Sequence, residues 1–153
     1  MSKNTTHILS RAVIIDQGHI LLCKTLDMQN NFYFLPGGHV EQSESASSAL
    51  IRELIEESGF RVVIQRFLGC LENGFESSES CKCHNHEYSF IFEASSTDLS
   101  LHSTIPQLEA HIVMQWMPLD KIAELPFKAE ALKQLIPQWL ALNMDNAFQS
   151  TMK

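Results

Sequence analysis

Three glutamates stand close together near the middle of the chain, Glu53, Glu56 and Glu57. In a helix, residues three and four positions apart lie on one side, so these carboxylates are expected to face the same direction. Like charges at such offsets destabilise a helix by about 0.2–0.5 kcal/mol per pair, and a bound cation would offset that repulsion. Mg²⁺ binds one or two carboxylates together with waters and phosphate oxygens. The spacing therefore predicts a Mg²⁺ site, in which Mn²⁺ can substitute, for a phosphorylated substrate.

The same segment predicts an amphipathic helix, because it also carries an apolar stripe made of Leu50, Ile51, Leu54 and Ile55. Arg52 falls beside Glu56 on the helical wheel, and Glu44 precedes the helix closely enough to bond its guanidinium. Ser45 is the predicted N-cap. A Glu-rich amphipathic helix is most often a solvated face with ordinary ion pairs. The metal-site interpretation therefore depends on the loop before the helix.

That loop has the residues of a sharp turn. Residues 32–35 read as a short strand, and Pro36, Gly37 and Gly38 follow it. Glycine permits backbone angles that other residues avoid, so a turn is predicted here. A carbonyl oxygen from Gly38, or from Gly37, is a candidate further ligand for the metal.

The segment from Gly38 to Phe60 resembles the Nudix box, the signature of hydrolases that cut nucleoside diphosphates linked to another group. The match covers all fixed positions of that pattern: Gly38, Glu44, Arg52, Glu53, Leu54, Glu56, Glu57, Gly59 and Phe60. The last position is usually aliphatic, and Phe60 departs from it. The resemblance implies an α/β fold, a Nudix-type α/β/α sandwich with a mixed β-sheet between helices. It also implies Mg²⁺-dependent hydrolysis of a phosphoanhydride bond by water attack at phosphorus.

The resemblance implies roles for individual residues. Glu53, Glu56 and Glu57 match the metal-ligand positions, and a carbonyl from Gly38 or its neighbour Gly37 is the further ligand. Arg52 and Glu44 match supporting positions in the catalytic machinery.

The general base is left open between a glutamate of the box and a glutamate from a distant part of the chain. Glu53 is the candidate within the box, and Glu109 is the best distant candidate, with Glu87 behind it. The alternative for Glu109 is an ordinary solvated loop acid.

Length and composition favour one compact domain spanning residues 1–153, since 153 residues with 44% hydrophobic content suffice for one core. The net charge of −7 argues against DNA binding, which requires a basic face. The family resemblance implies a small-molecule nucleotide as the partner. No apolar run approaches about 20 residues, and Met1 to Thr6 lacks the order of a secretion signal. A cytoplasmic protein without membrane contact is expected. A homodimer stays open, because dimers are common among proteins that carry the box.

Period-two apolar patterns and turn signals predict the other elements. The expected strands are 8–15 and 19–23, joined by a turn at Asp16, Gln17 and Gly18, and then 61–71, 88–94 and 111–117, of which 111–117 is the last. Residues 73–83 and 95–103 read as loops. A short helix is expected after Pro118, and a longer one over 128–142 with a bend near Pro137.

Four potential metal ligands gather at Cys81, Cys83, His84 and His86. Their spacing is tighter than usual zinc pairs, and in an extended chain the cysteines and histidines would face opposite ways. A polar entry to a strand is the favoured interpretation, and zinc is the alternative. Cys23 and Cys70 lie in apolar runs and are expected to be reduced core residues.

The substrate class is narrowed only in part. The Leu-Pro-Gly-Gly entry at 35–38 and the run 84–92 resemble ADP-ribose pyrophosphatase-like members of the family, but Phe75 lies in the region where a proline marks typical ADP-ribose enzymes. ADP-ribose-like compounds, nucleotide sugars and oxidised nucleoside triphosphates all remain candidates. Two other functions stay open: a nucleotide-sensing Nudix domain without catalysis, and an isomerase of isoprenoid diphosphates. An intact set of box residues argues against both.

Overall fold

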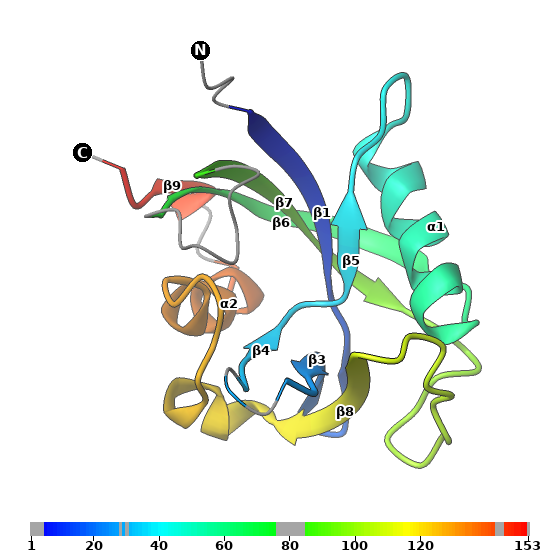
Figure 1. Cartoon of the computed structure of the whole chain (residues 1–153). Helices are drawn as coiled ribbons and strands as arrows, with labels where there is room; N and C mark the ends of the chain where they lie inside the picture. Colours follow the sequence, from blue (N-terminus) through cyan, green and yellow to red (C-terminus); the bar gives the residue numbers. More distant parts are fainter. Residues whose placement is uncertain (1–4, 28, 30, 76–84, 143–145, 153) are drawn as a thin grey trace.

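The structure is a computed structural model that describes residues 5–27, 29, 31–75, 85–142 and 146–152. Figure 1 shows how its elements are arranged. The strands are β1 (Thr6–Val13), β2 (Ile15–Asp16), β3 (His19–Thr25), β4 (Tyr33–Phe34), β5 (Gly37–His39), β6 (Val63–Gly74), β7 (His86–Ser95), β8 (Ile112–Pro118) and β9 (Phe148–Ser150). The helices are α1 (Ala46–Ser58), the 3₁₀-helix η1 (Leu119–Glu124) and α2 (Leu132–Leu140).

The strands form two sheets. The first has the order β5-β1-β7-β6-β9 and is mixed, because β1 runs parallel to β7 and β9 parallel to β6 while the other pairs are antiparallel. The second joins β2, β3, β4 and β8, with β3 pairing each of the other three in antiparallel fashion. The predicted α/β class with a mixed sheet is confirmed.

The alternating directions of side chains along β1 explain why the hydrophobic core has two layers. In β1, Val13 packs into the cluster that contains the α2 side chains, whereas Ala12 packs into the cluster that contains Leu50 and Leu54 of α1. Successive side chains of a strand point to opposite faces, so one strand serves both layers. Figure 1 shows α1 and α2 on opposite sides of the larger sheet, which is the predicted sandwich.

Helix α1 has the ends that its sequence predicts. The Ser45 side chain accepts a hydrogen bond from the amide of Ser48 at 3.1 Å, and Gly59 ends the helix with φ of 76°. Leu50 and Leu54 are buried as expected. The expectation for Ile55 is wrong, because it is 36% exposed. One residue turns a helix by about 100°, which carries Ile55 past the face that Leu54 presents to the sheet.

The predicted helix over 128–142 is too long. The amide of Lys128 donates to the carbonyl of Tyr33 at 2.8 Å, and Phe127 forms a β-bridge with Tyr33, so this segment is held beside β4. Ala129 then has a positive φ of 60°, a conformation that no α-helix continues. Helix α2 therefore begins only at Leu132, and it includes Pro137.

Two predictions about the strands are also wrong. Strand β6 continues to Gly74, where a loop from residue 73 was expected, because β7 pairs with it as far as His86. Strand β8 is not the last strand, because β9 follows α2 and pairs with β6, Cys70 opposite Phe148. A three-residue strand is too short to show a period in the sequence, and its pairing partner alone defines it.

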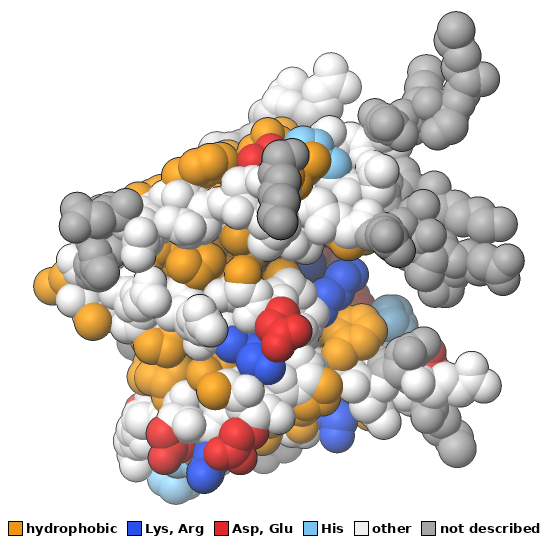
Figure 2. All heavy atoms as spheres, turned by 90° about the vertical axis from the view of Figure 1, so that its left-hand side faces the viewer, with side chains coloured by type: hydrophobic (Ala, Val, Ile, Leu, Met, Phe, Trp, Pro, Cys, Tyr) orange, Lys and Arg blue, Asp and Glu red, His pale blue; other side chains and the backbone are white. Residues whose placement is uncertain are grey.

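The face that carries α2 and β9 has a mixed surface. Figure 2 shows hydrophobic side chains in several groups on this face, with basic and acidic side chains in small numbers between them. Within the described ranges, no helix is both long and apolar enough to span a membrane.

Candidate metal and phosphate site

The site begins at the turn between β4 and β5, where nearby atoms leave no room for a side chain at either of two glycines. Gly37 has a φ of 121°, and a Cβ atom there would overlap the carbonyl oxygen of Ser10. A Cβ atom on Gly38 would overlap the carboxyl group of Glu53. The turn therefore lies directly against α1, and the structure brings Gly38 and Glu53 together.

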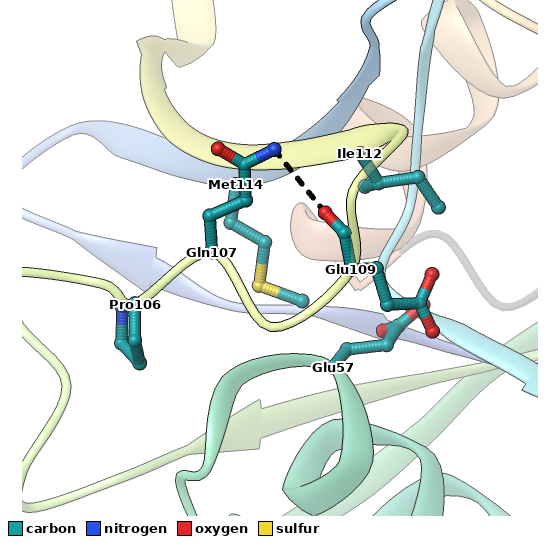
Figure 3. Close-up of a pocket in the computed structure, with 6 residues that line it drawn as sticks. All are labelled: Glu57, Pro106, Gln107, Glu109, Ile112 and Met114. Carbon is teal, nitrogen blue, oxygen red and sulfur yellow. Dashed lines mark hydrogen bonds between the residues drawn. The ribbon is translucent and has the colours of Figure 1, made fainter.

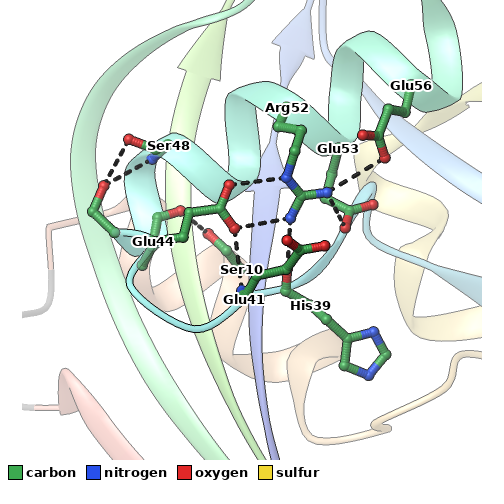
Figure 4. Close-up of polar contacts among 10 residues, drawn as sticks. Ser10, His39, Glu41, Glu44, Ser48, Arg52, Glu53 and Glu56 are labelled. Carbon is green, nitrogen blue, oxygen red and sulfur yellow. Dashed lines mark hydrogen bonds and ion pairs between the residues drawn. The ribbon is translucent and has the colours of Figure 1, made fainter.

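Arg52 connects the loop, the strand and the helix. Its Nε and Nη2 atoms donate to the two carboxylate oxygens of Glu44, both at 2.9 Å, which is a bidentate pair. Its Nη1 atom donates to Glu53 at 2.9 Å and to Glu56 at 3.4 Å, and Nη2 also donates to the carbonyl oxygen of His39 at 3.0 Å. Figure 4 shows the guanidinium between these carboxylates. The bond predicted between Arg52 and Glu44 is present.

Arg52 favours the charged form of Glu44. The hydrogen bond from Arg52 keeps the pKa of the Glu44 carboxyl below its ordinary value, with help from the Glu41 backbone. The same bond to Glu44 is the main reason that the pKa of Arg52 is raised. One guanidinium thus contacts three acidic side chains, and the Glu56 side chain is 56% exposed.

Glu57 differs from its neighbours because it is buried, with only 9% of its surface exposed. Its Oε2 atom accepts a hydrogen bond from the amide of Gly37 at 3.0 Å. Burial raises the pKa of Glu57 to about 7, against the opposing effects of the Gly37 amide and of Arg11. The negative charges of Glu53 and Glu109 raise this pKa further. Burial and the nearby carboxylates therefore disfavour the charged form of Glu57 when no cation is bound.

Glu109 reaches the same place from a distant part of the chain. A small pocket is lined by Glu57, Pro106, Gln107, Glu109, Ile112 and Met114. Figure 3 shows the side chains of Glu57 and Glu109 pointing toward the same region. The Glu109 side chain is 40% exposed and lies 3.7 Å from His111 Nε2, while Gln107 Nε2 donates to the Glu109 carbonyl at 3.2 Å.

Glu87, the other distant candidate for the base, lies elsewhere. It is buried in β7, in register with His7 of β1 and Asn73 of β6. The structure thus brings Glu109, and not Glu87, into the pocket beside Glu57.

The donor atoms of the site suit a hard divalent cation. Glu53, Glu56, Glu57 and Gly38 offer only oxygen, which is what Mg²⁺ and Mn²⁺ prefer, and the buried charge of Glu57 would be stabilised by a cation. The carboxylates are not preassembled around a point, however: no three His, Cys, Asp or Glu side chains among the described residues are placed to hold a metal. Arg52 contacts Glu53 and Glu56 in this arrangement.

Arg11 is a residue of the site that sequence reasoning missed. Its Nη1 atom donates to the carbonyl oxygens of Leu35, at 3.1 Å, and Gly37. Arg11 thus binds the Gly37 carbonyl, while Gly38 stands opposite Ser10 in the register of β1 and β5. The signal in the sequence was a single charged residue inside the apolar run 8–15.

The cysteine and histidine cluster of the sequence is only partly described. Cys81, Cys83 and His84 lie outside the described residues. His86 begins β7 and bonds Glu72 Oε1 through Nε2 at 2.9 Å. Cys23 and Cys70 are both free and buried, as predicted.

Comparison with protein families identifies the class of protein that this fold and site define. A family model described as the NUDIX domain matches residues 6–139. The chain therefore belongs to the NUDIX family, as the box predicted. A curated relative from Bacillus subtilis (strain 168), a putative 8-oxo-dGTP diphosphatase, is 37% identical over 57 residues, which make up 37% of each chain. The match thus spans little more than a third of that relative.

Solved structures share the fold over most of the chain. The MutT protein from Methanosarcina mazei Go1 has a TM-score of 0.69 at 22% identity and covers 92% of this chain and 97% of its own. A NUDIX hydrolase from Nitrosomonas europaea has a TM-score of 0.70 at 20% identity, with 90% of both chains covered. At these identities the likeness shows the fold alone.

Proposed function

We propose that this protein is a Mg²⁺-dependent pyrophosphohydrolase that cuts a phosphoanhydride bond of a nucleotide by attack of water at phosphorus. The observation that carries the proposal is the small pocket that Glu57 and Glu109 line together, beside a turn whose Gly37 amide binds Glu57 and whose Gly38 packs against the Glu53 carboxyl. Phosphoryl chemistry needs mainly positioning and neutralisation of charge, which a bound divalent cation supplies. The carboxylate oxygens of α1, of which Glu57 lines the pocket, suit that need.

Each residue has a distinct task in this proposal. Glu53, Glu56, Glu57 and the Gly38 carbonyl would hold the metal. Arg52 fixes Glu53 and, through Glu44 and His39, the loop that enters the helix. One guanidinium thus orients the Glu44 and Glu53 carboxylates, and groups positioned before the reaction lose less entropy when the transition state forms.

The base that accepts the proton of the attacking water is the remaining question. Glu109 is favoured over Glu53 because Glu53 already accepts a hydrogen bond from Arg52, whereas Glu109 lines the pocket with a partly exposed side chain. A general base must reach the water and accept its proton, which an engaged carboxylate does less readily.

For the substrate, we propose oxidised purine nucleoside triphosphates of the 8-oxo-dGTP class. The support is the name of the curated relative, whose matched segment is 37% identical to this chain. Hydrolysis would add water across the anhydride bond between the α- and β-phosphates, and would yield a nucleoside monophosphate and pyrophosphate. ADP-ribose and nucleotide sugars are the competing classes.

The isomerase alternative requires a reactive cysteine, and the described cysteines do not suit that role. Burial raises the pKa of the Cys23 thiol well above its ordinary value, and burial also raises the pKa of Cys70. A raised pKa keeps sulfur in its unreactive protonated form.

The test is a substrate panel assayed with Mg²⁺, with Mn²⁺ and with EDTA. It contains 8-oxo-dGTP, dGTP, ADP-ribose and UDP-glucose, and product release is measured by chromatography. We expect metal-dependent hydrolysis, with kcat/KM for 8-oxo-dGTP at least tenfold above that for dGTP. Preference for ADP-ribose or UDP-glucose would refute the substrate, and binding without cleavage of any compound would indicate a sensing domain.

A further inference from the structure

Arg11 is a partly buried cation inside β1, opposite Gly37 in the register of β1 and β5. It donates to the carbonyl oxygens of Leu35 and Gly37, which stand on either side of Pro36. Its guanidinium carbon lies 5.6 Å from the centre of the Phe34 ring. A planar guanidinium holds its donors in a fixed geometry and can also lie on a ring, whereas a lysine ammonium is a compact charge on a flexible stem. One side chain therefore holds both ends of the turn.

The backbone of β1 completes this attachment. The amide of Ala12 donates to the carbonyl of Pro36 at 2.9 Å, so the carbonyls of three consecutive residues, Leu35 to Gly37, are bound by Arg11 and Ala12. On its other side, Gly37 donates its amide to Glu57. The two peptide groups that flank Gly37 are thus fixed between β1 and α1, and neither can rotate without breaking a hydrogen bond.

The fixed turn adjoins two groups that would face the metal, the Gly38 backbone and the Glu57 carboxylate. Gly38 follows Gly37 directly and packs against the carboxyl group of Glu53. Glu57 is oriented by the Gly37 amide. A small rotation at Gly37 would therefore change the direction of the Gly38 backbone and remove the hydrogen bond that orients Glu57.

We propose that Arg11 is a positioning residue of the metal site: its guanidinium fixes the Leu35–Gly37 turn, and through the turn it sets the geometry of the Gly38 backbone and the Glu57 carboxylate. This inference rests on the proposed function of the site. It assigns to Arg11 no contact with substrate, and it predicts an effect on metal affinity that a purely structural arginine would not have.

The test compares Arg11→Lys with wild type by direct Mn²⁺ binding, measured by electron paramagnetic resonance, and by the Mg²⁺ concentration that gives half-maximal turnover. Lysine keeps the positive charge near Glu57, so any electrostatic repulsion of the metal is unchanged and the loss of the guanidinium is isolated. We expect the Mn²⁺ dissociation constant to rise at least fivefold, with a parallel rise in the half-saturating Mg²⁺ concentration. A smaller rise in the Mn²⁺ constant overturns the proposal.

Arg66→Lys is the matched control. Arg66 is also a partly buried arginine of the same sheet, and it pairs with Glu93 and donates to the carbonyls of Trp139 and Leu140. We expect Arg66→Lys to lower thermal stability while Mn²⁺ affinity stays within twofold of wild type. An equal loss of Mn²⁺ affinity in both variants would show a general loosening of the fold and would overturn the specific role of Arg11.

A second variant keeps the proposal testable if Arg11→Lys does not fold. Phe34→Leu retains Arg11 and removes the ring beside its guanidinium, and we expect at least a twofold loss of Mn²⁺ affinity; unchanged affinity overturns the proposal. The two proposals fail differently. Wild-type protein that binds Mn²⁺ but hydrolyses no nucleotide would refute the function alone, whereas active wild type with unaltered Arg11→Lys affinity would refute the role of Arg11 alone.

Discussion

Replacing Glu57 by glutamine is the sharpest perturbation of the site, because it removes a buried charge with little change in shape. Glu57 is 9% exposed and accepts the amide of Gly37, a bond that a glutamine side-chain oxygen can also accept. The variant should therefore fold with the turn in place. Two opposite effects are expected: loss of Mg²⁺-dependent turnover, and a gain of stability at alkaline pH when no metal is present.

The size of the stability effect follows from the pKa of Glu57, which burial raises from 4.5 to about 7. A raised pKa means that the folded protein holds the proton more tightly than the unfolded chain. The resulting stabilisation is complete below pH 4.5 and is lost as the pH rises through 7. The shift corresponds to about 3 kcal/mol, and burial makes a discount for solvent unnecessary. Metal-free wild type should lose about that free energy of unfolding between pH 4.5 and pH 8, relative to Glu57→Gln.

The assay is urea unfolding in EDTA at pH 5 and at pH 8, followed by tryptophan fluorescence, since Trp139 is almost fully buried and reports the core. We expect Glu57→Gln to gain on wild type by about 2.5 kcal/mol between the two pH values, since pH 5 lies slightly above the unfolded pKa. Added Mg²⁺ at pH 8 should stabilise wild type and leave the variant unchanged, because binding to the folded state alone raises stability.

The control is Glu124→Gln, whose side chain is 68% exposed on η1. Its stability relative to wild type should be the same at both pH values. If Glu57→Gln behaves like this control, burial does not raise the pKa of Glu57 in the folded protein. If Glu57→Gln keeps wild-type Mg²⁺-dependent turnover, Glu57 is not a ligand of the metal.

Two further substitutions test the remaining parts of the site. Glu109→Gln should lower kcat at least tenfold, about 1.4 kcal/mol of barrier, with Mn²⁺ affinity nearly unchanged; a loss under about threefold would return the role of base to Glu53. Gly38→Ala places a methyl group where the Glu53 carboxyl lies, so we expect at least a tenfold loss of turnover and a loss of about 1–3 kcal/mol in urea unfolding. Wild-type turnover and stability in Gly38→Ala would show that the Glu53 carboxyl does not pack against Gly38.

The helix of the site was predictable in detail because its signals are local. Ser45 caps the helix and Gly59 ends it, and both act through bonds to residues within four positions. The pair of Arg52 and Glu44 spans only eight residues. Ile55 was the exception, because the width of the buried stripe depends on how α1 lies on the sheet, which no local pattern encodes.

The wrong predictions concern elements whose limits are set by contacts far apart in sequence. Helix α2 begins late because Lys128 is bound to Tyr33, and β9 exists because Cys70 of β6 lies beside Phe148. Propensity within the segment carries no information about such partners.

The sequence by itself determined the family, the positions of the candidate ligands and the helix that carries three of them, because these depend on spacing within about twenty residues. Only the tertiary structure decided that Glu109 joins Glu57 in one pocket and that Arg11 binds the turn before Gly38. It also decided that Glu57, unlike Glu56, is buried. The physical reason is that burial, and with it the pKa of Glu57, arises from packing between elements, whereas the spacing of carboxylates on a helix is fixed by the geometry of one element.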